Sequence, residues 1–474
     1  NPERLPVLAW LPGGTPERLR LLSELGVTVT RDTSPGAVDW ATEAGLHTHP
    51  LIVLRGSARR GVAEDAILGH DGVPHGANPL SGHVLAEVRR EAAEYAENIR
   101  RLDTVRYAIL NSEWLLPLDF GEKSRRLARR KFGLDLAKWI AADPGEVWKS
   151  VHPFNRLNPT LLGADWFPAD GVVRSSRDPF YRFHLWWHTQ GPNEQVVNRI
   201  LAEEIKRVRP DITTVVEPVL RRPPVRVYPE NIDVAQEWFY YENPLTAVHV
   251  QERLAAISRG SQMKPSGMPQ FLFKPGGAAP FAATPPPDML RQVVWLCASR
   301  PLAMMSFWGW HRVLDKGKCF TIGEIKDRLG GLEGDAAWKA AKEWGEGGGL
   351  FIPEVRETFA DLSERLWRPF GPLLTKWRNL PRHVAVLDSL ANQVYNNTRW
   401  PRHGWLMDAL TASGVPYDVL FDQDFLTGAP LPGHYSVLVL PRMHAMTDRA
   451  HDHVAAFLRR GGRVVADAEC KVGR

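Results

Sequence analysis

The feature that most constrains this sequence is an alternation of short apolar segments with amphipathic ones along its first three hundred residues. Such alternation is typical of parallel βα units, in which a helix returns the chain to the next strand. Strands are expected at Val7–Trp10, Val27–Thr30, His49–Leu54, Arg106–Leu110, Ile212–Val216, Ile232–Ala235, Gln270–Phe273 and Ala303–Phe307. Eight such units in about 300 residues match a (β/α)8 TIM barrel of the α/β class.

A second alternation of strands and helices follows the first. We assign residues 1–320 to the barrel and residues 321–380, which are polar and helical in pattern, to a bridging segment. Residues 381–474 predict a flavodoxin-like α/β domain, with strands expected around His383–Asp388, Tyr417–Phe421, Ser436–Leu440 and Gly461–Asp467. At roughly 90 residues this segment is short for a complete domain of that kind.

Charge and composition argue against several classes of function. Basic residues exceed acidic ones by 59 minus 54, or +5, and are spread along the chain, so no nucleic-acid partner is expected. No apolar run reaches the roughly 18 residues that span a bilayer, so no membrane partner is expected.

The three cysteines lie far apart, and His49, His70 and His75 match no common ligand spacing. We therefore predict neither a metal nor another cofactor. The compartment stays open between the cytoplasm and secretion after cleavage of a leader.

The active site of such a barrel lies at the carboxyl ends of its strands. The expected fourth strand ends in Asn111, Ser112, Glu113 and Trp114. Hydrolysis of a glycosidic bond needs one carboxylic acid to protonate the leaving oxygen and a second carboxylate as nucleophile or base. Glu113 is our candidate for the acid, because burial beside Trp114 would raise its pKa. The alternative is a surface carboxylate at a strand end.

The second carboxylate has several candidates. Glu217 closes the fifth strand and Glu237 closes the sixth, while Glu242 is a third choice. We favour Glu237, because the aromatic residues beside it, Trp238 among them, would form a platform for a sugar ring. In the alternative interpretation these acids are ion-pair partners of Arg31, Arg221 or Lys274.

Several further residues at strand ends are candidates for binding substrate. Lys274 follows the expected seventh strand, where a cation could hold a uronate or sulfate group or pair with a nearby glutamate. Arg31 and His311 could hold sugar hydroxyls, although lone residues of this kind are often structural. The sequence holds 18 tryptophans, whose flat faces suit either sugar stacking or core packing. Of Trp308 and Trp310 we favour Trp308 as a platform.

Taken together, the chain resembles the β-galactosidase family that joins a catalytic barrel to a trimerisation domain of glutamine-amidotransferase-like fold. The resemblance rests on Asn111–Trp114, Phe307–Trp310 and Tyr435–Pro441 continuing to Gly461–Val465. It implies a glycoside hydrolase with Glu113 as acid/base, an oligosaccharide or polysaccharide substrate and a homotrimer.

The sequence departs from that family in two places. Ser112 separates Asn111 from Glu113, whereas the family usually has Asn directly before its acid/base. Lys274 stands where the family has its nucleophilic Glu at the end of strand seven. Either the strand is shifted, or the second carboxylate comes from elsewhere, or the enzyme is not a retaining one of the usual kind.

A catalytically repurposed, carbohydrate-binding barrel is therefore the competing hypothesis. Amidotransferase chemistry is not expected, because Leu440, Pro441 and Arg442 carry no nucleophilic cysteine.

Overall fold

A computed structural model gives the fold of the chain. The structure describes residues 4–10, 15–31, 35–52, 54, 65–69, 72–110, 119–136, 168–217, 219–220, 223–226, 230–239, 244–270, 287–310, 330, 354–396, 404–426 and 431–472. None of the helices in these ranges is long and apolar enough to cross a membrane.

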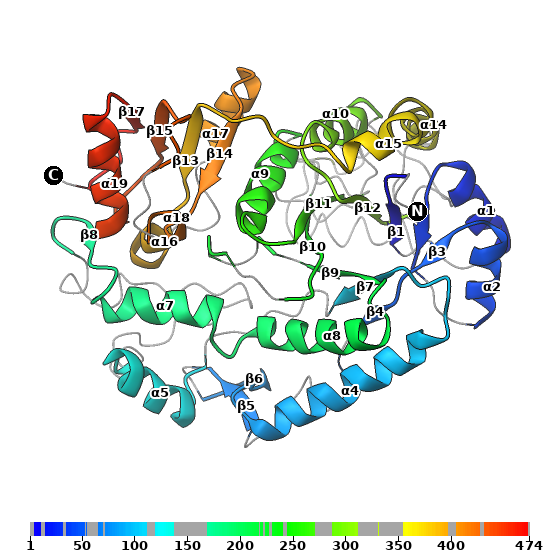
Figure 1. The fold of residues 1–474 in the computed structure, drawn as a ribbon, viewed down its shortest axis with the longest axis horizontal. Helices are drawn as coiled ribbons and strands as arrows, with labels where there is room; N and C mark the ends of the chain where they lie inside the picture. The colour runs from blue at the N-terminus through cyan, green and yellow to red at the C-terminus, as the bar shows by residue number, and fades with distance from the viewer. Residues whose placement is uncertain are drawn as a thin grey trace.

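The first part of the chain forms one parallel sheet with strand order β3-β2-β1-β12-β11-β10-β9-β7-β4. Its strands are β1 Val7–Trp10, β2 Val29–Thr30, β3 His47–Thr48, β4 Leu51–Ile52, β7 Tyr107–Leu110, β9 Thr213–Val216, β10 Val234–Phe239, β11 Lys264–Pro269 and β12 Met304–Trp308. This confirms the expected TIM-barrel α/β fold, and Figure 1 shows the strands inside a ring of helices.

The two ends of this strand order meet. β3 and β4 are successive pieces of one interrupted strand, and the predicted third strand spans only part of them. The Thr48 amide donates to the Thr104 carbonyl at 2.9 Å, and the Arg106 amide donates to the Thr48 carbonyl at 3.3 Å. Counting β3 and β4 as one position reduces the nine strands to eight, so the sheet closes on itself.

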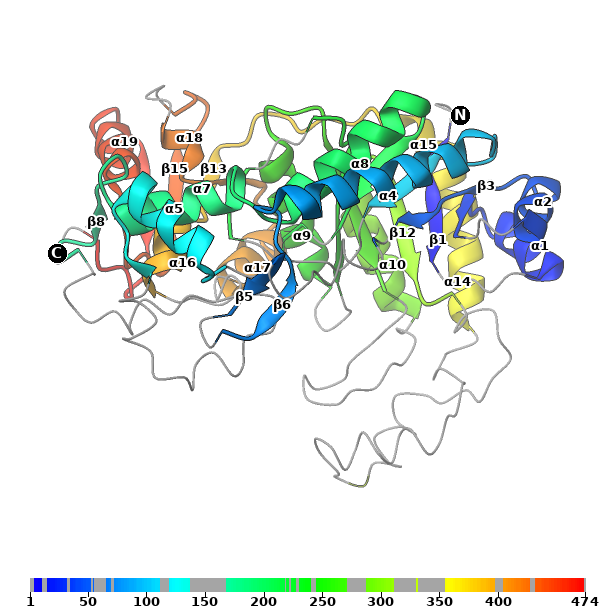
Figure 2. The ribbon, with the colours of Figure 1, turned by 90° about the horizontal axis from the view of Figure 1, so that it is seen from below.

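Amphipathic helices cover the outside of the barrel, and several begin at the residues that local chemistry favours. Thr15 caps the first of them by accepting from the Arg18 amide, with Pro16 in the first helical position, as the sequence suggests. Figure 2 shows α4 and α8 side by side. The helices are α1 Pro16–Glu24, α2 Pro35–Glu43, α4 Gly82–Arg100, α8 Glu194–Val208, α9 Thr246–Ser258 and α10 Pro287–Ala298.

Further elements extend the barrel. Between β7 and α8 lie the helices α5 Glu122–Phe132 and α7 Pro179–Thr189. A hairpin of β5 Ala66–Leu68 and β6 Pro74–Ala77 precedes α4. A parallel pair, β8 Val172–Val173 and β16 Met446–Thr447, joins the segment before α7 to the last part of the chain. The described part of the expected bridging segment is helical, as α14 Glu354–Leu362, the π-helix η5 Ser363–Trp367 and α15 Arg368–Leu374.

The last part of the chain forms a second parallel sheet, with order β14-β13-β15-β17. All four strands lie within or beside the predicted segments: β13 Val384–Leu387, β14 Tyr417–Leu420, β15 Val437–Leu440 and β17 Arg463–Ala466. The helices around them are α16 Leu390–Asn396, α17 Gly404–Ala412, α18 Gln423–Leu426 and α19 Asp448–Arg459.

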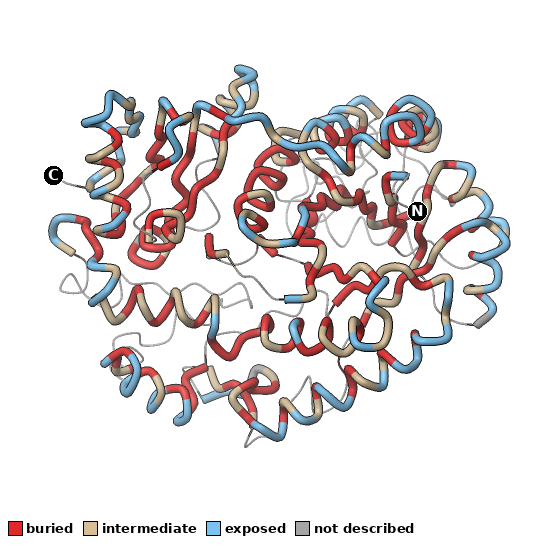
Figure 3. The backbone as a smooth tube through the Cα atoms, viewed as in Figure 1, coloured by how far each residue is buried: buried red, intermediate tan, exposed pale blue. Residues whose placement is uncertain are grey.

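The second sheet packs against the barrel through α9, which Figure 1 shows between them. Arg253 of α9 forms a buried ion pair with Asp388, which follows β13, at 3.0 Å. The adjacent Glu252 pairs with both Arg300 and Arg382. Apolar residues of the second sheet belong to the same buried cluster as the outer face of the barrel strands, so one core spans both sheets. Figure 3 shows the barrel strands and β13, β14 and β15 as mostly buried and the outer sides of the helices as exposed, whereas β17 is mostly exposed.

Candidate functional site at the barrel mouth

Alternation along the strands sorts their residues into two faces. Leu8, Val29, Ile109, Val215 and Met304 form one buried cluster with other inward-facing residues of the barrel. The intervening residues belong to the cluster that packs against the helices. The inward positions at the carboxyl ends are therefore the ones that can contact a substrate; those described are Trp10, Arg31, His49, Glu217, Trp238, Gln270 and Trp308.

Glu217 is the carboxylate among these positions. It follows β9, is 3% exposed, and accepts a hydrogen bond from Gln236 Nε2 at 3.2 Å. Ser306 Oγ donates to Gln236 Oε1 at 3.0 Å, which fixes the orientation of the amide. Glu217 is thus a carboxylate inside the barrel whose position is set by neighbouring polar side chains on β10 and β12.

Glu237 lies on the opposite face of β10. It shares this face with Ala235 and Phe239 of the outer cluster, and its Oε2 accepts from the Leu220 amide at 2.6 Å. Its register partner is Gly267, where a Cβ would meet side chains of α9 and α10. The helix layer therefore surrounds the favoured nucleophile of the sequence analysis, and its described contact secures the segment after β9.

The seventh strand differs from the sequence prediction. Gln270–Phe273 was expected because it is apolar, whereas β11 runs over Lys264–Pro269 and contains Pro265, Gly267 and Pro269. Proline and glycine disfavour central strands, so local pattern pointed to the wrong register. Gln270 directly follows β11 and bridges to Trp308, so an amide stands at the described carboxyl end of this strand. Lys274 lies outside the described residues.

Three inward-facing residues that follow or end β1, β2 and β3 form an aromatic and cationic side of the mouth. The rings of Trp10 and His49 lie 5.4 Å apart, and Arg31 Cζ lies 5.7 Å from the Trp10 ring centroid. Burial, with the nearby Arg31 charge adding to it, lowers the pKa of His49 to about 3. His49 is therefore a neutral imidazole at physiological pH.

Two of these residues were missed as site residues by the sequence analysis. Trp10 Nε1 is buried and forms no hydrogen bond within the described part of the chain. Trp10 ends an expected barrel strand, so the rule that selected Arg31 could have found it. His49 begins the expected third strand, so that rule could not have found it; only the observed position of β3 beside β2 places it at this point.

The tryptophans at the mouth differ in burial. Trp238 is 7% exposed and faces inward, and Trp308 is partly exposed and pairs in register with Trp10. Trp310 is fully buried, with its ring centroid 4.6 Å from Phe359. Trp310 is therefore a core residue, and the role of Trp308 as a sugar platform stays a prediction.

Five of the predicted site residues lie outside the described residues: Asn111, Glu113, Trp114, Lys274 and His311. The same holds for Glu242. β7 ends at Leu110, directly before this predicted acid/base motif, and is paired with β9, which Glu217 follows. Among the residues that the structure describes, no group of three His, Cys, Asp or Glu side chains could hold a metal ion.

Solved structures share this fold across nearly the whole chain. A β-galactosidase from Rahnella sp. R3 is 13% identical with a TM-score of 0.62, over 98% of this chain and 71% of that one. The chain adopts the fold of these barrels. A family 42 β-galactosidase from G. stearothermophilus is 11% identical with a TM-score of 0.58, over 98% of this chain and 71% of its own. An exo-β-1,4-mannosidase from Opitutaceae bacterium strain TAV5 is 12% identical with a TM-score of 0.50, over 99% of this chain and 78% of the mannosidase. No family model and no curated protein matches the sequence.

Proposed function

We propose that this chain is a glycoside hydrolase that binds an oligosaccharide or polysaccharide at the barrel mouth and cleaves a glycosidic bond there. The observation that carries the proposal is Glu217, a buried carboxylate on the inner face of a barrel whose mouth is lined by Trp10, Trp238 and Trp308. Indole faces stack on pyranose rings, and the reaction needs carboxyl groups on either side of the anomeric carbon.

In this proposal Glu113 is the general acid/base and Glu217 the second carboxylate. The strands that lead to them, β7 and β9, are neighbours in the sheet, which favours two carboxyl groups on one side of the mouth. The fold shared with β-galactosidases supports a β-galactosidase-like reaction. Asn111, Trp114, Arg31 and His311 are proposed to bind sugar hydroxyls or faces, and Lys274 an acidic group on the sugar.

The test is hydrolysis of aryl glycosides by the full chain and by Glu113→Gln. We expect turnover of a nitrophenyl β-galactoside or β-mannoside, and a loss of roughly 10²–10⁴-fold in the variant, because general acid catalysis contributes about that much. A dinitrophenyl leaving group needs little protonation, so it should restore much of the rate. Glu364→Gln, at an exposed position on η5, is the matched control. Equal rates for the wild type and Glu113→Gln would reject the role of Glu113.

A carbohydrate-binding barrel without catalysis is the second candidate. Gln270 favours it, because an amide stands at the end of strand seven, where the resembled family has its nucleophile. Binding of a β-galactoside without turnover of any aryl glycoside would identify this function.

We also propose that the second sheet belongs to a flavodoxin-like domain within residues 381–474, related to the amidotransferase-like fold, that mediates assembly. Its order β14-β13-β15-β17 is second-first-third-fourth along the chain, which agrees with that class. Sedimentation analysis tests the implied trimer, and a monomer at micromolar concentration would reject it.

A further inference from the structure

Helix α5 carries an unusual excess of positive charge. Its eleven residues include six basic side chains and one acidic one, Glu122. Cations in the last helical turn interact favourably with the helix dipole, which accounts for part of this pattern. Lys131, near the end of the helix, also contacts the neighbouring helix α7 through its side chain.

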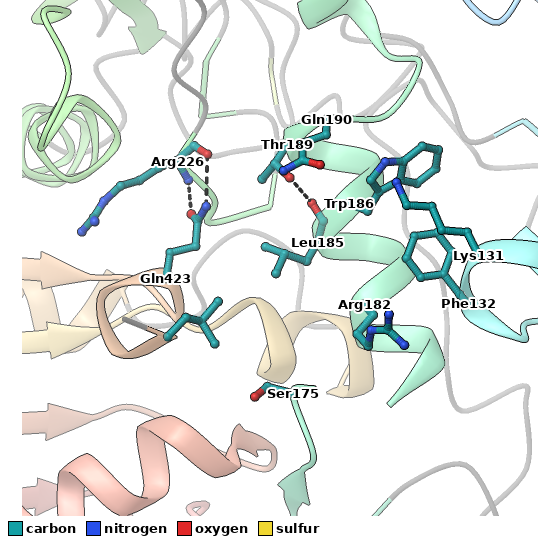
Figure 4. A pocket seen from close by; sticks show the side chains of 11 residues that line it. Lys131, Phe132, Ser175, Arg182, Leu185, Trp186, Thr189, Gln190, Arg226 and Gln423 are labelled. Carbon is teal, nitrogen blue, oxygen red and sulfur yellow. Dashed lines mark hydrogen bonds between the residues drawn. The ribbon is translucent and has the colours of Figure 1, made fainter. Parts of the chain in front are cut away.

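Lys131 lines a cavity of about 570 Å³ between α5, α7 and α18. Figure 4 shows Lys131, Phe132 and Trp186 together on one side of it, with Arg182 beside them and Gln423 across from them. A volume of this size lies within the range of roughly 300–1,000 Å³ found for small-ligand sites.

Aromatic rings, not carboxylates, hold the two cations of this cavity. Lys131 Nζ lies 4.6 Å from the Trp186 ring centroid and 5.7 Å from that of Phe132. Arg182 Cζ lies 5.7 Å from the Phe132 ring centroid. Neither cation forms an ion pair with an acid in the described part of the chain. Contact with an aromatic face orients a cation without neutralising its charge.

The third cation of the cavity behaves differently. Arg226 pairs with Asp424, and its Nε donates to the Ala256 carbonyl at 3.1 Å. In Figure 4 its guanidinium points away from Thr189 and Gln190. Lys131 and Arg182 are therefore the charges that the cavity offers to a ligand.

We propose that this cavity, the α5–α7 groove, binds a carboxylated or sulfated glycan chain. The two oriented cations suit an anionic substituent, and Thr189 and Gln190 supply polar groups for sugar hydroxyls. That the anion is carried by a sugar rests on the proposed hydrolase function. A nucleic-acid ligand is less well matched, since such surfaces use long rows of phosphate contacts and only two available cations lie here.

The test measures calorimetric binding of tetragalacturonate and of neutral galactotetraose to the full chain in the Glu113→Gln background. We expect Lys131→Ala/Arg182→Ala to weaken tetragalacturonate binding at least tenfold and to leave galactotetraose binding unchanged. Trp186→Ala should weaken it as well, because it removes the surface that holds Lys131. The matched control is Arg90→Ala/Arg126→Ala, which removes two charges from exposed positions on α4 and α5.

The outcomes separate this inference from the proposed function. Loss of tetragalacturonate binding in the groove variant but not in the control supports the inference, even if no glycoside is hydrolysed. Equal losses in both variants, no binding of tetragalacturonate, or tighter binding of a single-stranded oligonucleotide of equal charge would overturn it. Unchanged thermal midpoints are required of each variant, and Arg182→Lys, which keeps the charge, should bind within threefold of the parent.

Discussion

The barrel mouth and the interface between α9 and the second sheet both bury carboxylates, but the described partners of these carboxylates differ. At the interface, guanidinium groups face the acids: Arg253 meets Asp388, and Arg300 and Arg382 both meet Glu252. At the mouth, the described hydrogen bond to Glu217 comes from the neutral amide of Gln236. The described partners of the interface acids are thus full positive charges, whereas the described partner of Glu217 is an amide that orients it.

This difference has a physical consequence. A buried acid opposite an arginine is held ionised and inert, and removal of the arginine leaves a costly unpaired charge. A carboxylate at the carboxyl ends of barrel strands lies where a substrate binds, so its neighbours serve to position it. The interface is therefore expected to set stability, and the mouth to set reactivity.

The largest expected effect is a loss of activity, caused by a substitution at the barrel mouth that leaves the interface unchanged. Glu217→Gln should lower kcat/KM on an aryl glycoside by about 10³-fold or more, because a second carboxylate is required for the chemistry. Its free energy of unfolding should change by less than about 1 kcal/mol, since a glutamine can still bond to Gln236.

Glu237→Gln is the matched control for that change, because the two glutamates differ in the face of the barrel that they occupy. We expect it to keep activity within about tenfold, since Glu237 faces the helix layer and its described partner is the Leu220 amide, in the segment after β9. The reverse result, with Glu237→Gln inactive and Glu217→Gln active, would contradict the assignment.

The next effect is expected at the interface. Arg253→Ala leaves Asp388, which is fully buried, without its guanidinium, and should lower the free energy of unfolding by about 3–5 kcal/mol in a urea titration. Arg259→Ala is the control, because Asp424 retains Arg226 and Arg259 is 34% exposed. Equal effects of the two changes would show that the interface does not depend on matched charges.

The smallest expected effect concerns the pH dependence of the mouth. The pKa of His49 is lowered from 6.5 to about 3 in the fold, so this residue stabilises the protein above pH 6.5 and that contribution is lost as the pH falls towards 3. The loss should reach roughly 1 kcal/mol between about pH 6.5 and 5.5. His49→Gln should flatten this part of the stability curve, whereas the exposed His83→Gln should not. A slope unchanged in His49→Gln would contradict the buried neutral imidazole.

Much of the fold could be predicted because the alternation of strands and helices depends on the pattern of consecutive residues. β1, β7, β9, β12 and the strands of the second sheet lie where apolar runs and caps indicate them. Strand seven could not be located in this way, because β11 contains two prolines and a glycine and the apolar run after Gln270 was the stronger local signal.

The sequence by itself determined that the chain forms parallel βα units and that carboxylates and tryptophans cluster where strands end. Only the tertiary structure decided which of them face inward. A side chain changes face with every residue along a strand, so a shift of one position exchanges the inner and outer sets. The contrast between Glu217 and Glu237 arises there, because the pairing of β10 with β9 and β11 directs one glutamate to the barrel interior and the other to the helices.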